Sequence, residues 1–161
     1  MGANVVKINI LCIGSIKENF YIQACHEYIK RLSKYHTVNV IELEEEKIPK
    51  NAGIADIAKI KVKESMKFDK YLKGYNIVLD IFGKNFTSEE FAEQLSKISN
   101  TSFVVNFIIG GSYGLSEDIK RRADMCLSFS KFTFPHQLMR VILLEQIYRA
   151  TTINNNITYH K

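Results

Sequence analysis

Two short apolar runs, each closed by glycine, most constrain the fold of this chain. The first spans residues 75–82, contains Asp80 as its one acid, and ends at Gly83. The second spans residues 103–109 and ends at Gly110. Strands that are apolar on both faces are typical of parallel sheets covered by helices. The two runs therefore predict a parallel sheet that is buried between helices.

The rest of the chain alternates between strand-like and helix-like patterns. β-Branched and apolar residues predict strands over 5–13 and 37–43, and apolar residues at helical spacing predict a helix from Glu18 onward. Thr87 or Ser88 is expected to cap another helix. Residues 1–4 are expected to form a loose end. The pattern is typical of an α/β fold with four or five strands, and residues 1–161 are predicted to form a single domain.

Composition narrows the class of protein. The 161 residues are 46% hydrophobic and 24% charged, which is ordinary for a globular protein. The cysteines are three in number and no Cys-x-x-Cys motif occurs, so we expect reduced core thiols and no metal site. No apolar run is long enough for a membrane span, and the start has no signal-peptide pattern. We therefore expect a cytoplasmic protein that does not enter a membrane.

Lysines gather in one segment of the chain. Residues 47–73 hold eight lysines against three acids, a local balance of 8 − 3 = +5 that equals the net charge of the whole chain. A helix in this segment has Ile57, Ile60, Phe68 and Leu72 on its apolar side, interrupted by Glu64. Such a segment is either a solvated helix face or a surface that binds phosphate backbones. Charge alone does not decide between the two.

A glycine turn follows the second apolar run. Residues 110–115 read GGSYGL, and Ser116 opens a helix with acids in its first turn. The spacing is not that of a dinucleotide fingerprint, no Walker lysine follows, and the acids would repel a phosphate. Glycines at the carboxyl end of a strand nevertheless let a ligand approach the backbone. A plain turn and a ligand loop both remain open.

An aromatic, hydroxyl-bearing stretch and an apolar helix come next. Residues 129–134 form either an aromatic core segment or a loop that surrounds a flat heterocycle. Pro135 is expected to start a helix over 135–153, with His136 as a helix-start residue or a base. The helix is apolar nearly all round at residues 141–144, so a homodimer interface is plausible. Glu145 and Arg149 are spaced as a helical ion pair, whereas Arg140 has no such local partner.

Several motifs in order closely resemble the bacterial RlmH family, a group of SPOUT-class enzymes that methylate N3 of a pseudouridine in large-subunit rRNA. They cover almost the whole chain: residues 13–18 (IGSIKE), 79–84 (LDIFGK), 88–92 (SEEFA), 108–115 (IIGGSYGL), 127–136 (LSFSKFTFPH), 140–141 (RV), 145–150 (EQIYRA) and 159–161 (YHK). A few extra residues before Lys7 are the one departure. The resemblance implies an α/β sheet with a deep carboxyl-terminal trefoil knot, and a homodimer that acts on rRNA within the ribosome.

The resemblance also implies a cofactor and a set of site residues. S-adenosylmethionine, with S-adenosylhomocysteine as product, would be held by Leu79, Gly110 and the loop of Phe129, Ser130, Lys131, Phe132, Thr133 and Phe134. The candidates for handling the N3 proton or the developing anion are His136, Arg140, Arg149, Tyr159 and His160, and the tail residues would reach the pocket of the partner subunit.

Two hypotheses from other classes remain at this point. A basic module that binds RNA or ribosomes without catalysis would use the lysine segment and need no cofactor. A Rossmann-like nucleotide-binding enzyme would show the same alternation of strands and helices, but the glycine-rich dinucleotide fingerprint expected of it is missing.

Overall fold

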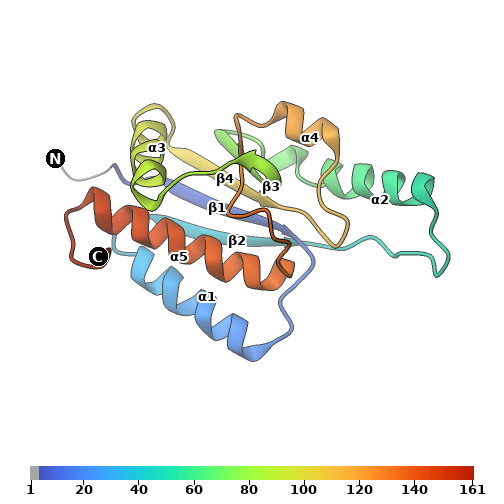
Figure 1. Cartoon of the computed structure of the whole chain (residues 1–161), viewed down its shortest axis with the longest axis horizontal. Helices are drawn as coiled ribbons and strands as arrows, with labels where there is room; N and C mark the ends of the chain where they lie inside the picture. Colours follow the sequence, from blue (N-terminus) through green and yellow to red (C-terminus); the bar gives the residue numbers. More distant parts are fainter. Residues whose placement is uncertain (1–3) are drawn as a thin grey trace.

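The computed structural model describes residues 4–161, so the predicted loose end lies outside the described residues except for Asn4. A five-stranded sheet forms the centre of the molecule, in the order β2-β1-β4-β3-β5, and every pairing in it is parallel (Figure 1). The strands are β1 (Lys7–Ile13), β2 (Thr37–Leu43), β3 (Tyr75–Lys84), β4 (Val104–Ile109) and β5 (Met125–Leu127). The predicted buried parallel sheet is confirmed.

Helices cover both faces of the sheet. They are α1 (Asn19–Leu32), α2 (Ile54–Met66), the 3-10 turn η1 (Asp69–Tyr71), α3 (Ser88–Thr101), α4 (Glu117–Arg122) and α5 (His136–Asn154). On one face α5 lies between α1 and α3 and forms the larger apolar core with them. On the other face a smaller core joins the sheet to η1, α4 and Phe68. None of the helices in residues 4–161 is both long and apolar enough to span a membrane.

Boundaries differ from the sequence-based expectations by one or two residues at most ends. β1 begins at Lys7 and β4 at Val104, while β3 continues to Lys84 through an irregular pairing with β5. α5 begins at His136 because Pro135 has the extended backbone of a cap residue. Thr87 caps α3 as predicted, since its Oγ1 accepts a hydrogen bond from the Glu90 amide. The three cysteines are free thiols.

A row of asparagines fixes the register of four neighbouring strands. Asn39 donates to Asn9, Asn9 donates to Asn106, and Asn106 donates to Asn76, over distances of 3.2, 2.8 and 2.9 Å. Asn106 is fully buried, so its amide needs hydrogen-bond partners within the protein, and the neighbouring asparagines supply them. A one-residue slip of any strand would break the row. The row therefore helps to align the strand ends where the pocket lies.

Candidate active site

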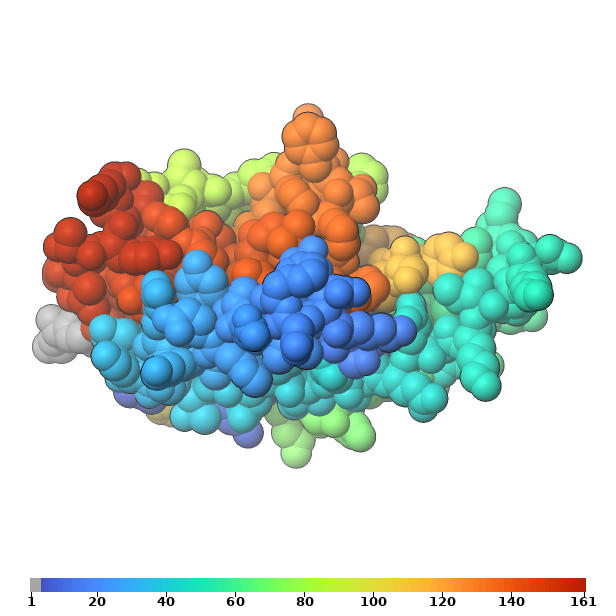
Figure 2. All heavy atoms as spheres, turned by 90° about the horizontal axis from the view of Figure 1, so that it is seen from below, coloured from blue at the N-terminus to red at the C-terminus, as the bar shows by residue number. Residues whose placement is uncertain are grey.

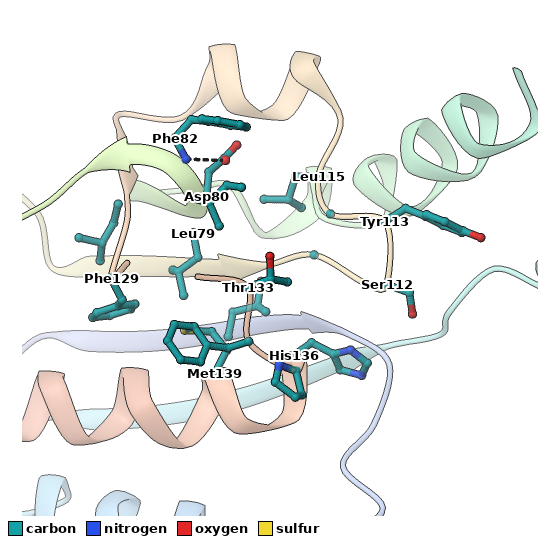
Figure 3. A pocket seen from close by; sticks show the side chains of 18 of the residues that line it. Leu79, Asp80, Phe82, Ser112, Tyr113, Leu115, Phe129, Thr133, His136 and Met139 are labelled. Carbon is teal, nitrogen blue, oxygen red and sulfur yellow. Dashed lines mark hydrogen bonds between the residues drawn. The ribbon is translucent and has the colours of Figure 1, made fainter. Parts of the chain in front are cut away.

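The main cavity lies at the carboxyl edge of the sheet, where β3 and β4 end (Figure 3). Its volume is about 730 Å³, and its walls come from the loops after β4 and β5, the end of β3 and the start of α5. Ligands of open α/β sheets bind at this edge. Seven of the eight residues predicted for the cofactor line the cavity, and only Lys131 does not: they are Leu79, Gly110, Phe129, Ser130, Phe132, Thr133 and Phe134.

The glycine turn is folded back on itself against the cavity. Gly114 donates its amide to the Gly111 carbonyl at 3.0 Å and has a φ of +75°, a conformation that favours glycine. A Cβ on Gly110 would stand 2.7 Å from the carbonyl carbon of Gly114. A side chain at position 110 is thus excluded unless the turn opens. The missing side chain leaves the backbone of the turn next to the cavity.

Helix α2 supports the glycine turn from behind. The Ser65 hydroxyl accepts a hydrogen bond from the Ser116 amide at 3.2 Å. Glu64 is 3% exposed, accepts from the Glu46 amide at 2.9 Å, and has its other oxygen 3.1 Å from where a Cβ of Gly111 would stand. Burial raises the pKa of the Glu64 carboxyl. These contacts hold the turn in one conformation.

Sequence reasoning treated Glu64 only as an interruption of an apolar helix face. Its burial shows that it belongs to that face and supports the site. An acid at a core position of an amphipathic helix is the signal that could have identified it, because such a carboxylate needs buried partners. The helix itself ends at Met66, so Phe68 and Leu72 lie beyond it.

The aromatic loop after β5 is held by hydrogen bonds at its first residue. Ser128 is buried, donates its hydroxyl to the Ile81 carbonyl at 3.1 Å, and its carbonyl accepts from the Asn85 side chain at 2.9 Å. Phe129 packs against the larger core, whereas Phe132 is 78% exposed at the cavity rim. Residues 128–135 form no strand, which favours the ligand-loop interpretation of this stretch.

An ion pair borders the cavity beside β3. The Lys120 ammonium pairs with the Asp80 carboxylate, which also accepts the Phe82 amide at 3.0 Å (Figure 3). Burial by itself would raise the pKa of Asp80, but the ammonium and the amide together lower it. Asp80 is therefore a carboxylate at neutral pH. It gives this side of the cavity a fixed charge pair and no general base that titrates near pH 7.

The predicted catalytic residues separate into three places. His136 is the first residue of α5 and lines the cavity. Arg140 is 1% exposed and does not line it; the guanidinium pairs with Glu42 and donates to the Gly14 carbonyl at 2.5 Å. Arg140 thus ties α5 to β2 and to the turn after β1.

Arg149, Tyr159 and His160 form a tail cluster at the other end of α5. The Arg149 guanidinium pairs with Glu145 at 2.5 Å, and the Tyr159 hydroxyl donates to the same carboxylate at 3.0 Å. His160 lies 3.2 Å from Arg149 and 2.8 Å from Glu89. With a rise of about 1.5 Å per residue, Arg149 is about 20 Å along α5 from His136. Within one chain the tail cluster and the cavity are separate.

The electrostatics of the tail cluster restrict what Tyr159 can do. Burial raises the pKa of the Tyr159 phenol, and its hydrogen bond to Glu145 raises it further. The phenol therefore stays protonated at neutral pH. It can donate a hydrogen bond but it is a poor base in this position.

The described residues contain no group of three or more His, Cys, Asp and Glu side chains that could hold a metal ion. A cavity with a glycine turn, an aromatic loop and no phosphate site, at the carboxyl edge of a parallel sheet, is suited to a nucleoside-like ligand. The fold and the site thus define an α/β protein with a small-molecule pocket. Comparisons with known proteins refine that class.

A family model described as "Predicted SPOUT methyltransferase" matches residues 6–160. Among solved structures, a methylase family protein from Haemophilus influenzae shares the fold at a TM-score of 0.57, with 13% identity and coverage of 96% of this chain and 70% of that one. A protein from Legionella pneumophila described as a methyltransferase, in complex with S-adenosylmethionine, has a TM-score of 0.50 at 15% identity, over 90% and 66% of the two chains.

Curated relatives are much more similar in sequence. Ribosomal RNA large subunit methyltransferase H from Clostridium novyi is 48% identical over 159 residues, which covers 97% of this chain and all of the relative. The chain belongs to the SPOUT methyltransferases and, within them, to the ribosomal RNA large subunit methyltransferase H family. The resemblance stated from the sequence motifs is confirmed.

Proposed function

We propose that this protein transfers a methyl group from S-adenosylmethionine to N3 of a pseudouridine in large-subunit rRNA, and that it acts on the assembled ribosome. The observation that carries the proposal is the cavity at the carboxyl edge of the sheet, where the glycine turn and the aromatic loop meet. Family membership supports the reaction class and the rRNA substrate. The product of the cofactor would be S-adenosylhomocysteine.

The residues of the cavity fit this cofactor. Its volume lies within the roughly 300–1,000 Å³ that is usual for small-molecule sites. Leu79 and Phe129 offer apolar walls for a flat adenine, and the turn at Gly110 offers backbone groups that no side chain covers. Glu117 and Asp118 stand in the first turn of the next helix, which disfavours a phosphate. A nucleoside without phosphates therefore suits the site better than NAD or ATP.

When bound, the cofactor would supply an activated methyl group on a sulfonium centre. The chain would then have to align the target base with that methyl group, exclude water and accept the imide proton from N3. His136 is the predicted catalytic side chain that lines the cavity. In the proposed mechanism the Arg149 guanidinium stabilises the developing anion, and the neutral Tyr159 phenol donates a hydrogen bond.

The distance between the tail cluster and the cavity supports a homodimer. In the proposed dimer the tail of one subunit, with Arg149, Tyr159 and His160, completes the cavity of the other. Leu143 and Leu144 are fully buried in the core of the single chain, so the proposed contact region on α5 is limited to the half-buried Val141 and Ile142. Arg140 would act as a positioning residue, because its contacts hold the turn that faces His136.

We further propose that residues 1–161 form one cytoplasmic methyltransferase domain with a carboxyl-terminal trefoil knot. In this arrangement the stretch from β4 to α5, which contains both cavity loops, would form the knotted part. The match of the SPOUT methyltransferase family model to residues 6–160 supports the proposal. Slow refolding after complete denaturation, compared with unknotted α/β proteins of this length, is the expected consequence.

Transfer of labelled methyl from S-adenosylmethionine to ribosomes that lack the modification tests the proposed reaction. We expect labelling of intact ribosomes, little labelling of free rRNA, and a labelled nucleoside that is N3-methylpseudouridine. Binding of S-adenosylmethionine without labelling of either substrate would support the assignment of the cofactor pocket and refute the proposed target. Failure to bind the cofactor would refute both.

A further inference from the structure

We propose that a lysine surface formed by α2 (Lys59, Lys61 and Lys63) and the segment before it (Lys47 and Lys50) binds the phosphate backbone of the substrate RNA beside the cavity. This inference deepens the proposed function and rests on it. It assigns a role to the basic segment that neither the fold nor the cofactor pocket requires. The occupant that it names is RNA, because closely spaced phosphates complement unpaired ammonium groups.

The acids of the same segment are all engaged elsewhere. The Asp56 carboxylate accepts the Gly53 amide at 3.0 Å at the start of α2, and Glu64 is buried behind the glycine turn. Asp69 pairs with Arg122 at 2.9 Å. None of the three forms an ion pair with these lysines. Two acids outside the segment lie within electrostatic reach of them, Glu46 near Lys63 and Asp80 near Lys61, and each is already paired with another lysine. The positive charge of the lysine surface faces solvent.

The lysines of the surface have no ionic partner within residues 4–161. Of the eight lysines in this segment, Lys67 alone forms an ion pair there, with Glu46 at 2.7 Å. Lysines on other helices differ: Lys120 of α4 pairs with Asp80 and Glu117, and Lys97 of α3, at the opposite end of the molecule from α2, pairs with Glu93. The lysines of α3 and α4 are thus paired with carboxylates, whereas those of α2 are not. An anionic partner would complete the balance.

The position of α2 places this charge next to the site. Lys61 lines the cavity, while Lys59 and Lys63, one turn apart, are exposed on the other side of the same helix. Figures 1 and 2 both show α2 at one end of the molecule, beside the loop that follows β4. Ile60 and Ser65 are buried against the body, so the helix is fixed in place. An RNA strand along α2 would therefore lead into the cavity.

Three exposed lysines that do not line the cavity provide the test. We would substitute Lys50→Ala, Lys59→Ala and Lys63→Ala together, and compare this triple variant with Lys7→Ala, Lys30→Ala and Lys34→Ala. Each set removes three exposed lysines and lowers the formal net charge from +5 to +2. Binding to ribosomes and to large-subunit rRNA is measured over a series of salt concentrations, and methyl transfer and binding of S-adenosylmethionine are measured separately.

We expect the α2 variant to bind RNA at least about ten-fold more weakly at physiological salt. The slope of log affinity against log salt should become shallower by about two to three, since each lost phosphate contact contributes about 0.7 to 0.9. Cofactor affinity should not change, and the control variant should bind as the wild type does. Rescue by Lys→Arg at the same three positions would support a role for charge.

The outcomes separate this inference from the proposed reaction. Methyl transfer by the wild type with equal RNA binding by both variants would overturn the lysine surface and leave the reaction intact. Lysine-dependent RNA binding without methyl transfer would support the surface and refute the reaction. Lysine-dependent binding that survives RNase digestion of the ribosome would assign the surface to an acidic protein and would overturn the proposal. A wild-type protein that binds no RNA at all would overturn it too.

Discussion

The two ends of α5 are built in different ways. At the start of the helix, the cavity is surrounded by turns that are fixed through buried contacts, such as those of Ser65 with Ser116 and Ser128 with Ile81. At the far end, the tail cluster is held mainly by charged groups near the surface. The His160 side chain is 27% exposed and that of its partner Glu89 is 64% exposed.

This difference indicates different degrees of freedom. Buried hydrogen bonds are costly to break, so the cavity is expected to be largely formed before any ligand binds. The exposed pair of His160 with Glu89 contributes little to stability, so His160 can leave this contact at low cost, whereas Tyr159 is half-buried against Tyr148 and Arg149. A preformed pocket and a tail that can move are what a site shared between two subunits requires.

The largest effect is expected from removing the tail side chains. Tyr159→Ala combined with His160→Ala should lower turnover by about 100-fold or more, the scale typical of lost acid-base groups. Affinity for S-adenosylmethionine should stay the same, because the two residues are proposed to act on the target base and do not line the cofactor cavity of their own chain. Single-turnover methyl transfer and equilibrium binding of the cofactor measure the two quantities. Unchanged turnover in the double variant would remove the tail from the mechanism.

A substitution at the cavity end of α5 should act mainly on cofactor affinity. Gly110→Ala places a Cβ 2.7 Å from the Gly114 backbone and forces the turn to shift. Overpacking costs about 1–3 kcal/mol, so cofactor affinity should fall by about 5- to 150-fold. Gly53→Ala is the matched control, since its Cβ would meet nothing closer than 3.7 Å. Equal cofactor binding by the two variants, measured by calorimetry, would contradict the assignment of the turn.

A smaller, pH-dependent effect is expected behind the cavity. Burial raises the pKa of Glu64 in the folded state above the value of about 4.5 that it has in the unfolded chain. As pH rises above about 4.5, the unfolded chain therefore loses this proton before the folded protein does. Its contribution to stability is therefore full below that pH and is lost as pH rises through the folded-state pKa. Glu64→Gln avoids the loss and keeps an acceptor for the Glu46 amide.

Thermal unfolding of the two proteins at pH 4 and pH 8 measures this effect. The melting temperature of the Gln variant should exceed that of the wild type at pH 8, and the difference should shrink toward zero at pH 4. A variant that is less stable by the same amount at both pH values would show that the carboxylate oxygen near Gly111 is needed for packing.

The smallest effect is expected at the surface of the tail. Glu89→Gln removes the ionic partner of His160 and should raise hydrogen exchange of the tail amides by no more than about five-fold. Turnover should not fall. Glu93→Gln is the control, because it removes the Lys97 pair on the same helix without touching the tail. A large loss of turnover in the Glu89 variant would indicate that the docked tail is the active form.

Local patterns were sufficient to predict much of the fold and the pocket. Apolar runs gave the strands, and capping chemistry gave the start of α3, because both depend on neighbours in the sequence. The cofactor residues were expected from the resemblance to the RlmH family, and all of them except Lys131 line the cavity. The assignment of these residues, Lys131 included, to the cofactor stays a prediction, because sequence alone does not show how an irregular loop turns its side chains.

Contacts between distant segments were beyond the reach of such patterns. Arg140 finds its carboxylate at Glu42, 98 residues earlier, and the asparagine row joins four strands. The burial of Glu64 depends on a turn 47 positions later in the chain. Each of these features needs the three-dimensional arrangement, because nothing in the local sequence specifies the partner.

The shared site can be tested most directly by mixing two variants of low activity, at a cofactor concentration that does not saturate the Gly110 variant. One carries Gly110→Ala and has an intact tail, and the other carries Tyr159→Ala with His160→Ala and has an intact cavity. If the tail of one subunit completes the cavity of the other, co-refolded or co-expressed heterodimers should regain methyl transfer to ribosomes, at up to about half the activity per dimer. Activity that stays at the level of the separate variants, in heterodimers confirmed by mass, would contradict the shared site.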